Sequence, residues 1–427
     1  MFRGPKISPR KSGRSVSAHK IGLTLGMRHE QQVRLIKQLC AHIDAGTSCD
    51  AGGLRMVPTS SYTDPALADR EWNEFFMKVP QCLGMSRDLP EPGSFLTNND
   101  LGVPILATRD SGGTFKAFVN SCRHRGVVVE SEERGTKRRF TCPFHAWSYD
   151  TGGALVGLPK TDHFGDVDKE CLSLVSLPAE ERHGLLFVHP DVNGEMNLDD
   201  LLGTWFNDEF PTWGFADLEP LVHDAYDTAC NWKLALDTFG ETYHFPVLHK
   251  NTLSNGFHGN VQIHDEEDHL HRMILCKRDI DRMRNAPEDT WDITVAGLPV
   301  YWLFPNLILL LVPGGCSVVR MYPDRSDPGR HLSRITFYRR PGPGDDDPEL
   351  MEFMVAASQR FAHIIRDEDY VMSASQQTSA SSGRLKHVIF GRNEPTLHHY
   401  HNTYRRWLGE DELPLLDESA IGNGQST

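Results

Sequence analysis

Two cysteines and two histidines form a pair of ligand motifs in the first half of the chain. Cys122 and His124 flank one residue, and after a gap of 17 residues Cys142 and His145 flank two. Thiolates and imidazoles on two short loops suit either a structural zinc ion or a [2Fe–2S] cluster with mixed ligands. Zinc motifs usually pair like residues, whereas each half here carries one Cys and one His. The mixed halves favour the cluster, with the two cysteines on one iron and the two histidines on the other.

A second set of metal-binding side chains follows residue 231. Asp237, Glu241 and His244 recur at i, i+4 and i+7, which predicts one face of a helix over residues 231–244. His249 lies five residues beyond His244, about 140° further around an ideal helix. We therefore expect Pro246 to break the helix and redirect the chain. Two histidines and one carboxylate, with open positions on the metal, are the ligands with which non-haem Fe(II) oxygenases activate O2.

Both stretches closely resemble the signatures of Rieske non-haem iron oxygenases. In the first stretch the resemblance covers ligand types and spacing, Pro143 after the second Cys, Trp147 two residues after the second His, and a closing Gly turn. In the second, Asn-Trp-Lys at 231–233 leads to an acidic residue, to Tyr-His and to another His five residues later. The resemblance implies that Cys122, His124, Cys142 and His145 hold the Rieske cluster and that His244 and His249 bind a mononuclear iron.

The third iron ligand implied by the resemblance is a distant carboxylate on a late helix. The family places there an Asp that follows an acidic residue and precedes Gln by seven positions. Asp369 fits, with Glu368 before it and Gln376 after it. Asp367 is the alternative.

Two positions depart from the common family pattern. Thr238 and Glu241 stand where relatives often carry Asn and Asp. The resemblance implies that Glu241 bridges the mononuclear site to His145 of a neighbouring subunit, in a closed homotrimer. A bridging Glu occurs both in relatives that act on quaternary ammonium compounds and in some aromatic-ring oxygenases, so it leaves the substrate open.

The pattern of short and long apolar segments predicts an α+β protein: a small all-β module, followed by an antiparallel sheet with helices segregated from it. The resemblance implies that these are an all-β Rieske domain and a helix-grip-like catalytic domain. Expected helices cover residues 31–45, ending at Gly46, residues 65–77, and residues 348–365, and a long strand is expected over 300–312. The expected segments are a flexible basic tail (1–29), an N-terminal helical segment packing on the catalytic domain (30–71), the Rieske domain (72–190), the catalytic domain (191–415) and a flexible tail (416–427). Residues 1–29 carry seven basic residues and no acidic one, so an organelle transit peptide is the alternative there.

Composition excludes several classes of protein. A net charge of −14 argues against nucleic acid as the main partner. The most apolar run, residues 303–312, is too short for a membrane span and is interrupted by Pro305 and Asn306. Nine scattered cysteines and no apolar signal segment indicate a cytoplasmic protein with reduced thiols.

The resemblance implies the terminal oxygenase of a multicomponent system, which hydroxylates or dihydroxylates an aromatic or related small organic substrate with O2. NAD(P)H would act through a separate reductase, possibly with a ferredoxin, because the chain has no Gly-rich dinucleotide fingerprint. The alternative in the same family is a quaternary-ammonium (choline-, betaine- or carnitine-like) monooxygenase or N-demethylase. Alternatives of other classes are a non-catalytic Rieske electron carrier and a zinc-stabilised lipid-binding module. Candidate pocket-wall residues are Phe239, Tyr243, Phe245, Leu248, Phe257, Val300, Trp302 and Phe304.

Overall fold

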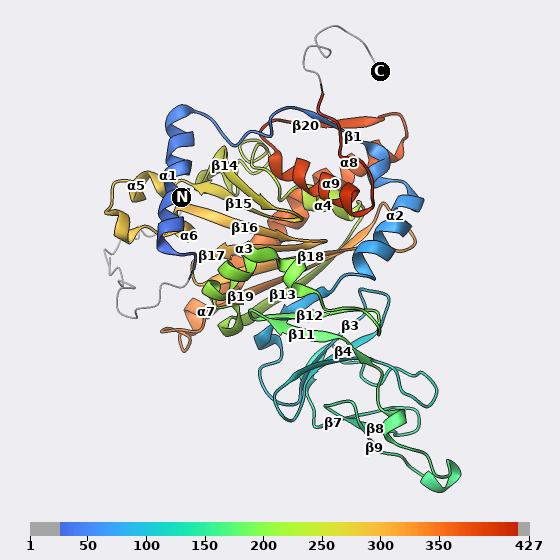
Figure 1. Cartoon of the computed structure of the whole chain (residues 1–427). Coiled ribbons are helices and arrows are strands. Elements are labelled where there is room, and N and C mark those ends of the chain that lie inside the picture. The colour runs from blue at the N-terminus through green and yellow to red at the C-terminus, as the bar shows by residue number, and fades with distance from the viewer. Residues whose placement is uncertain (1–25, 417–427) are drawn as a thin grey trace, which may run out of the picture.

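The computed structural model describes residues 26–416. Figure 1 shows a small β domain below and to the right of a larger domain that is built on a long sheet. The α+β class expected from the sequence is confirmed. Within the described residues, no helix combines the length and the apolar character needed to cross a bilayer.

The small domain consists of three antiparallel sheets. Their orders are β10-β5-β4-β3-β6, β11-β12-β2 and β7-β8-β9. It has a hydrophobic core of its own, in which Phe95, Phe140 and Tyr149 pack with Cys122 and Cys142. The strands are β2 (Gln81–Met85), β3 (Ser94–Asn98), β4 (Ile105–Arg109), β5 (Phe115–Val119), β6 (Arg134–Thr136), β7 (Arg139–Thr141), β8 (Ser148–Asp150), β9 (Leu155–Gly157), β10 (Ser176–Leu177), β11 (Ala179–Arg182) and β12 (Leu185–Val188).

The large domain is built on a seven-stranded antiparallel sheet of order β13-β19-β18-β17-β16-β15-β14. Its strands are β13 (Glu219–Thr228), β14 (Phe257–Glu267), β15 (Leu270–Lys277), β16 (Gly297–Leu303), β17 (Leu307–Val312), β18 (Gly315–Pro323) and β19 (His331–Arg339). The expected single strand over 300–312 is wrong: the run folds into the β16–β17 hairpin, in which Val300 pairs with Leu310. Pro305 and Asn306 are turn residues, and Pro cannot donate to a sheet ladder, so the apolar run reverses there.

The helices of the large domain lie around this sheet (Figure 1). They are α3 (Leu198–Trp213), α4 (Trp232–Asp237), α5 (Ile280–Met283), α6 (Ile293–Ala296), α7 (Pro348–Ile364), α8 (Tyr370–Ser381) and α9 (Pro395–Trp407). The expected helix over 348–365 is confirmed as α7, which Asp347 caps by accepting hydrogen bonds from Glu349 and Leu350 N–H. A π-helical turn, Ile365–Asp369, joins α7 to α8.

The N-terminal helices form as expected. Helix α1 (His29–Ala45) ends at Gly46, whose φ of 62° is the left-handed conformation that terminates helices. Helix α2 (Pro65–Glu71) continues as a π turn, Trp72–Phe76, and β1 (Arg55–Pro58) pairs with β20 (His387–Phe390). Most of the predicted tails, 1–29 and 416–427, lies outside the described residues 26–416. Met27, which the sequence analysis assigned to the tail, is buried in the core.

Candidate metal centres

In the first ligand group, Cys142 and His145 lie in the turn between β7 and β8, and Cys122 and His124 lie in the loop after β5. Strands β7–β9 form the end of the small domain that points away from the large one (Figure 1). Cys122 and Cys142 are buried, whereas His145 is exposed. The Nδ1 atoms of His124 and His145 face each other at 3.1 Å. The structure therefore brings the two imidazoles together and places the two thiols beside each other.

Neighbouring groups hold these side chains in place. The indole of Trp147 stacks on the His124 ring, with centroids 5.0 Å apart and planes inclined by 10°. The Tyr149 hydroxyl lies 3.4 Å from Cys122 Sγ and accepts a hydrogen bond from the Arg123 N–H. Burial raises the pKa of the Cys142 thiol, and the adjacent Cys122 adds to the rise, whereas the Phe144 and His145 N–H groups oppose it. Two thiols in a shared buried site with two outward imidazoles fit a Rieske [2Fe–2S] cluster, which would hold the sulfurs as thiolates.

The second ligand group lies in a stretch of turns and not on a helix. The expected helix over 231–244 is wrong in its second half, because α4 ends at Asp237. Consecutive turns follow, in which the Leu248 N–H donates to the His244 carbonyl and the Thr252 N–H to the His249 carbonyl. Pro246 does not break the helix, because α4 has already ended at Asp237, but the chain turns around Pro246 as expected and both imidazoles point at one place.

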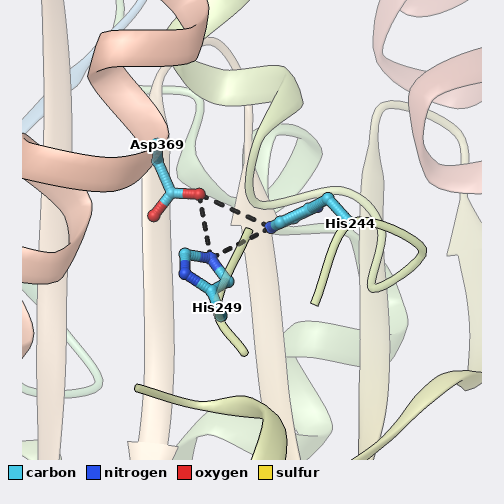
Figure 2. A group of neighbouring side chains, drawn as sticks. All are labelled: His244, His249 and Asp369. Carbon is cyan, nitrogen blue, oxygen red and sulfur yellow. Dashed lines mark hydrogen bonds and ion pairs between the residues drawn. The ribbon is translucent and has the colours of Figure 1, made fainter. Parts of the chain in front are cut away.

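Three side chains meet there (Figure 2). The Nε2 atoms of His244 and His249 lie 3.2 Å apart, and Asp369 Oδ1 is 3.4 Å from the former and 3.2 Å from the latter. Each residue offers a ligand atom within 4.8 Å of the others. His249 and Asp369 are buried, and His244 is partly buried. The set of two imidazoles and one carboxylate fits a mononuclear iron site with open positions.

The π turn places the carboxylate of this triad. Asp369 ends the turn and points at the two histidines. Asp367, the alternative ligand, instead pairs with the guanidinium of Arg366 at 2.6 and 2.7 Å, and its side chain is 56% exposed. Of the two candidates, only Asp369 lies with the histidines.

Two more carboxylates contact the far ring nitrogens. The Nδ1 atom of His244 contacts Glu241 Oε1, and His249 Nδ1 lies 2.6 Å from Glu368 Oε2. Burial lowers the pKa of His244, but hydrogen bonds with Asp369 and Glu241 outweigh it and raise the pKa to about 9. The pKa of Asp369 is lowered although burial acts to raise it, because both imidazoles bond to it. Three carboxylates around two imidazoles make a site that favours a cation.

Two cavities reach the triad. The larger, about 720 Å³, is bordered by α4, α8, β20 and the turns after α4, and its polar lining includes Asp237, Glu241 and Glu394. The smaller, about 50 Å³, lies between the triad and the sheet and is walled mainly by Phe and Leu side chains. Glu241 and His244 line both, so Glu241 stands between the two spaces.

The predicted pocket wall is partly correct. Phe239, Phe245, Phe257 and Val300 line the small cavity, and Leu248 lines the large one. Tyr243 is 66% exposed. Trp302 and Phe304 are core residues that pack against Tyr404, so their assignment to the pocket is wrong. Val300 and Trp302 are two positions apart on β16 and so share a face of the sheet, but Trp302 packs against Tyr400 and Tyr404 of α9, which no local pattern in the sequence reveals.

Sequence reasoning missed the partners of Asp237. Its carboxylate accepts hydrogen bonds from the Tyr62 hydroxyl at 3.1 Å and from His401 Nε2 at 3.0 Å. Both partners come from segments more than a hundred residues away, and no local pattern marks them. Asp237 is thereby held on the wall of the large cavity and away from the triad.

Comparisons with known proteins match both halves of this architecture. A family model for the Rieske [2Fe-2S] domain matches residues 79–176, and one for the ring hydroxylating alpha subunit (catalytic domain) matches residues 215–410. The carnitine monooxygenase oxygenase subunit of Acinetobacter baumannii is 31% identical over 353 residues, covering 82% of this chain and 89% of that protein. The biphenyl 2,3-dioxygenase subunit alpha of Rhodococcus jostii is 32% identical over 188 residues, covering 43% of this chain and 41% of that protein.

Solved structures agree on the fold. A quaternary ammonium Rieske monooxygenase superposes with a TM-score of 0.69 at 22% identity, covering 83% of this chain and 94% of that one. The naphthalene 1,2-dioxygenase of a Rhodococcus species does so with a TM-score of 0.67 at 18% identity, covering 88% and 97%.

The fold and the two ligand groups define an iron-dependent oxygenase subunit with its electron-transfer cluster in the same chain. The chain belongs to the family of Rieske non-haem iron oxygenase alpha subunits. The alternatives of a carrier without catalysis and of a zinc-stabilised lipid-binding module are therefore wrong, since the catalytic domain of the family is present.

Proposed function

We propose that this chain is the terminal oxygenase of a system that monooxygenates or N-demethylates a small quaternary ammonium compound. The main observation in support of this proposal is that the His244–His249–Asp369 triad opens onto a cavity walled by four phenylalanines. Similarity supports the substrate class, since carnitine monooxygenase subunits match 81–82% of the chain and aromatic dioxygenase subunits 43–48%. The sequence alone favours an aromatic substrate, and the carnitine monooxygenase matches reverse that order.

The ligand roles are part of this proposal. Cys122, Cys142, His124 and His145 hold the [2Fe–2S] cluster, and His244, His249 and Asp369 hold one Fe(II). When bound, the cluster supplies electrons and the iron supplies the open positions at which O2 is activated. Glu241 accepts the Nδ1 proton of His244 and so keeps its Nε2 lone pair directed at the metal.

The lining of the small cavity determines which substrate groups can approach the metal. Phe239, Phe245, Phe257 and Phe361 line it together with aliphatic side chains. Aromatic faces attract a trimethylammonium group by cation–π interaction, and the apolar wall excludes water from the reacting carbon.

A second candidate is hydroxylation or dihydroxylation of an aromatic compound. The same four phenylalanines favour it, because an aromatic ring stacks on them without any charge to bury. The bridging position, Glu241, is compatible with both candidates.

Electrons are proposed to come from NAD(P)H through a separate reductase, with or without a ferredoxin, and to pass between subunits. Figure 1 shows β7–β9 at the end of the small domain that is remote from the helices around the triad. A head-to-tail homotrimer would bring one protomer's cluster to its partner's triad, since a heterologous interface that closes after three copies makes a cyclic trimer.

We also propose that the protein is located in the cytoplasm.

Iron analysis and turnover test this function. We expect about three Fe per chain, two in the cluster and one in the mononuclear site, and a visible spectrum that dithionite bleaches. Asp369→Ala should keep the spectrum and lose the third iron and the activity. With a coupled reductase, carnitine, choline and betaine should be oxidised faster than toluene, indane or benzoate. Turnover of the aromatic compounds alone would replace the first candidate with the second.

A further inference from the structure

Two consecutive carboxylates converge on one imidazole at the end of the π turn. Asp369 Oδ1 lies 3.2 Å from Nε2 of His249, and Glu368 Oε2 lies 2.6 Å from Nδ1 of the same ring. Neighbouring residues of a regular helix diverge by about 100°. The wider turn over Ile365–Asp369 coincides with the place where both side chains reach His249. Such π turns inside helices frequently occur at functional sites.

Glu368 is itself held in position. Its Oε2 atom also accepts a hydrogen bond from the Thr252 hydroxyl at 2.9 Å, and its side chain is 25% exposed. Thr252 lies three residues after His249, and its N–H donates to the His249 carbonyl at 3.0 Å. The carboxylate therefore ties the turn that carries His249 to the turn that carries Asp369.

The placement of Glu368 differs from that of Glu241. Glu241 lines both cavities at the triad, where a substrate or another subunit can reach it. Glu368 lines neither, and within residues 26–416 its carboxylate bonds to the far side of His249 and to Thr252. Its position suits it for acting on the metal site through His249 alone.

We propose that Glu368 is a positioning residue that fixes the tautomer and the ring orientation of His249 at the mononuclear iron, an inference that rests on the proposed function. By accepting the Nδ1 proton, the carboxylate leaves the Nε2 lone pair facing Nε2 of His244 and Oδ1 of Asp369. A carboxylate partner also makes the imidazole a stronger donor to the metal. Each histidine of the triad then has its own carboxylate, Glu241 for His244 and Glu368 for His249.

The test compares Glu368→Gln with Asp367→Asn in the protein that retains its Rieske cluster. Both variants remove one negative charge from the same turn, but Asp367 pairs with Arg366 and contacts neither histidine. The mononuclear site is stripped and titrated with Fe(II), and then with Co(II), whose visible bands report the ligand field. Glu368→Gln should weaken Fe(II) binding about 10- to 100-fold, the range for such outer partners, and shift the Co(II) bands. Asp367→Asn should match the wild type in both.

A merely structural role for Glu368 would lower the unfolding temperature and leave the Co(II) bands of the folded protein unchanged. That result, or Fe(II) affinity equal to that of Asp367→Asn, overturns the inference. If Glu368→Gln does not fold, Thr252→Val removes one of the two hydrogen bonds to Oε2 and should give a smaller change in the same direction; an unchanged Fe(II) affinity and spectrum there overturns it equally. His244→Ala separates the two hypotheses, since iron binding that survives this change contradicts the mononuclear site itself.

Discussion

The proposed cluster ligands differ in exposure in a way that suits electron transfer. Cys122 and Cys142 are buried in the core of the small domain, while His145 is exposed beside Phe144, which is itself 50% exposed. Buried sulfurs are shielded from solvent and oxidants, whereas an exposed imidazole edge gives an electron a short way out. Neutral imidazoles also carry less negative charge than thiolates and raise the reduction potential of the cluster.

Cys122→Ser should abolish the visible absorption and the activity together, because a hydroxyl does not replace a thiolate on iron. The control is Cys171→Ser, an exposed cysteine whose thiol lies 3.3 Å from Asp168 and outside the ligand group. We expect it to keep the spectrum and the activity. Absorption spectra of the two purified variants decide the matter, and a reddish-brown Cys122→Ser protein would contradict the ligand assignment.

The elements around the mononuclear site show what local sequence patterns can and cannot predict. Helix α1, helix α7 and the Rieske loops follow from apolar spacing, capping residues and ligand motifs, all of which are local. Local patterns do not predict that α4 ends at Asp237, since residues 238–244 keep a helical spacing of polar groups. Their turns depend on contacts with β14 and α9, which are distant in sequence. Family resemblance predicts Asp369 as an iron ligand, whereas only the structure shows Glu368 beside His249.

Strand β14 supports the turn that carries the two histidines. The Asn260 N–H donates to Thr242 Oγ1 at 3.0 Å, at a point where the pairing of β14 with β15 is interrupted between Phe257 and Gln262. A Cβ atom on Gly259 would lie 2.7 Å from Cγ of Pro246, the residue that redirects the chain between the histidines. Because the backbone at Gly259 approaches the ring of Pro246 so closely, there is no room for a side chain at position 259.

Gly259→Ala should therefore destabilise the protein by about 1–3 kcal/mol, the usual cost of overpacking, and lower its mononuclear iron content. Gly256→Ala is the matched control, because a Cβ there meets nothing within 4 Å. Thermal unfolding and iron analysis of the two variants test the prediction. Equal stability and equal iron content in both would show that the turn adjusts freely to the added methyl group.

At the scale of the whole molecule, several histidines are buried and neutral. Burial lowers the pKa of His331 and His399 to about 4 and the pKa of His271 well below its ordinary value. Unfolded histidines take up protons below about pH 6.5. The unfolded chain then binds more protons than the folded one, so the stability from these groups is complete above pH 6.5 and is lost as the pH falls toward 4.

The unfolding temperature should thus drop by about 5 °C or more between pH 7 and pH 5. His399→Gln should flatten this slope, since it removes one of the protonation sites. His163→Gln, at a side chain that is 65% exposed, should leave the slope unchanged. A scan of unfolding temperature against pH for the three proteins provides the measurement, and an equal slope in all three would contradict the assignment of acid sensitivity to the buried histidines.

The trimer proposal makes Glu241 the group that connects two protomers. Glu241 already holds His244 through Nδ1, and it lines the large cavity beside Asp237 and Glu394. Val247 and Ile389, which border the same cavity, have exposed apolar side chains. Their exposure to water does not stabilise a monomer, whereas an interface would bury them. Glu241 Oε2 already accepts the Tyr243 and His244 N–H groups, so the exposed His145 of a neighbour would donate to the remaining lone pair of Oε1.

Glu241→Gln tests the connection, because it keeps the size of the side chain and removes its charge and one acceptor. At saturating Fe(II), we expect a trimer in solution, both metal centres occupied and the cluster reduced at the normal rate, but turnover lowered about tenfold or more, as when an outer carboxylate of a metal ligand is lost. Glu288→Gln, at an exposed carboxylate paired with Lys37 at 2.8 Å, is the control and should turn over normally. Single-turnover experiments with pre-reduced protein separate the steps: a slow oxidation of the cluster in Glu241→Gln locates the defect between the centres. An active monomer, or a fully active Glu241→Gln trimer, would place the electron route within one chain and remove the reason for the ring.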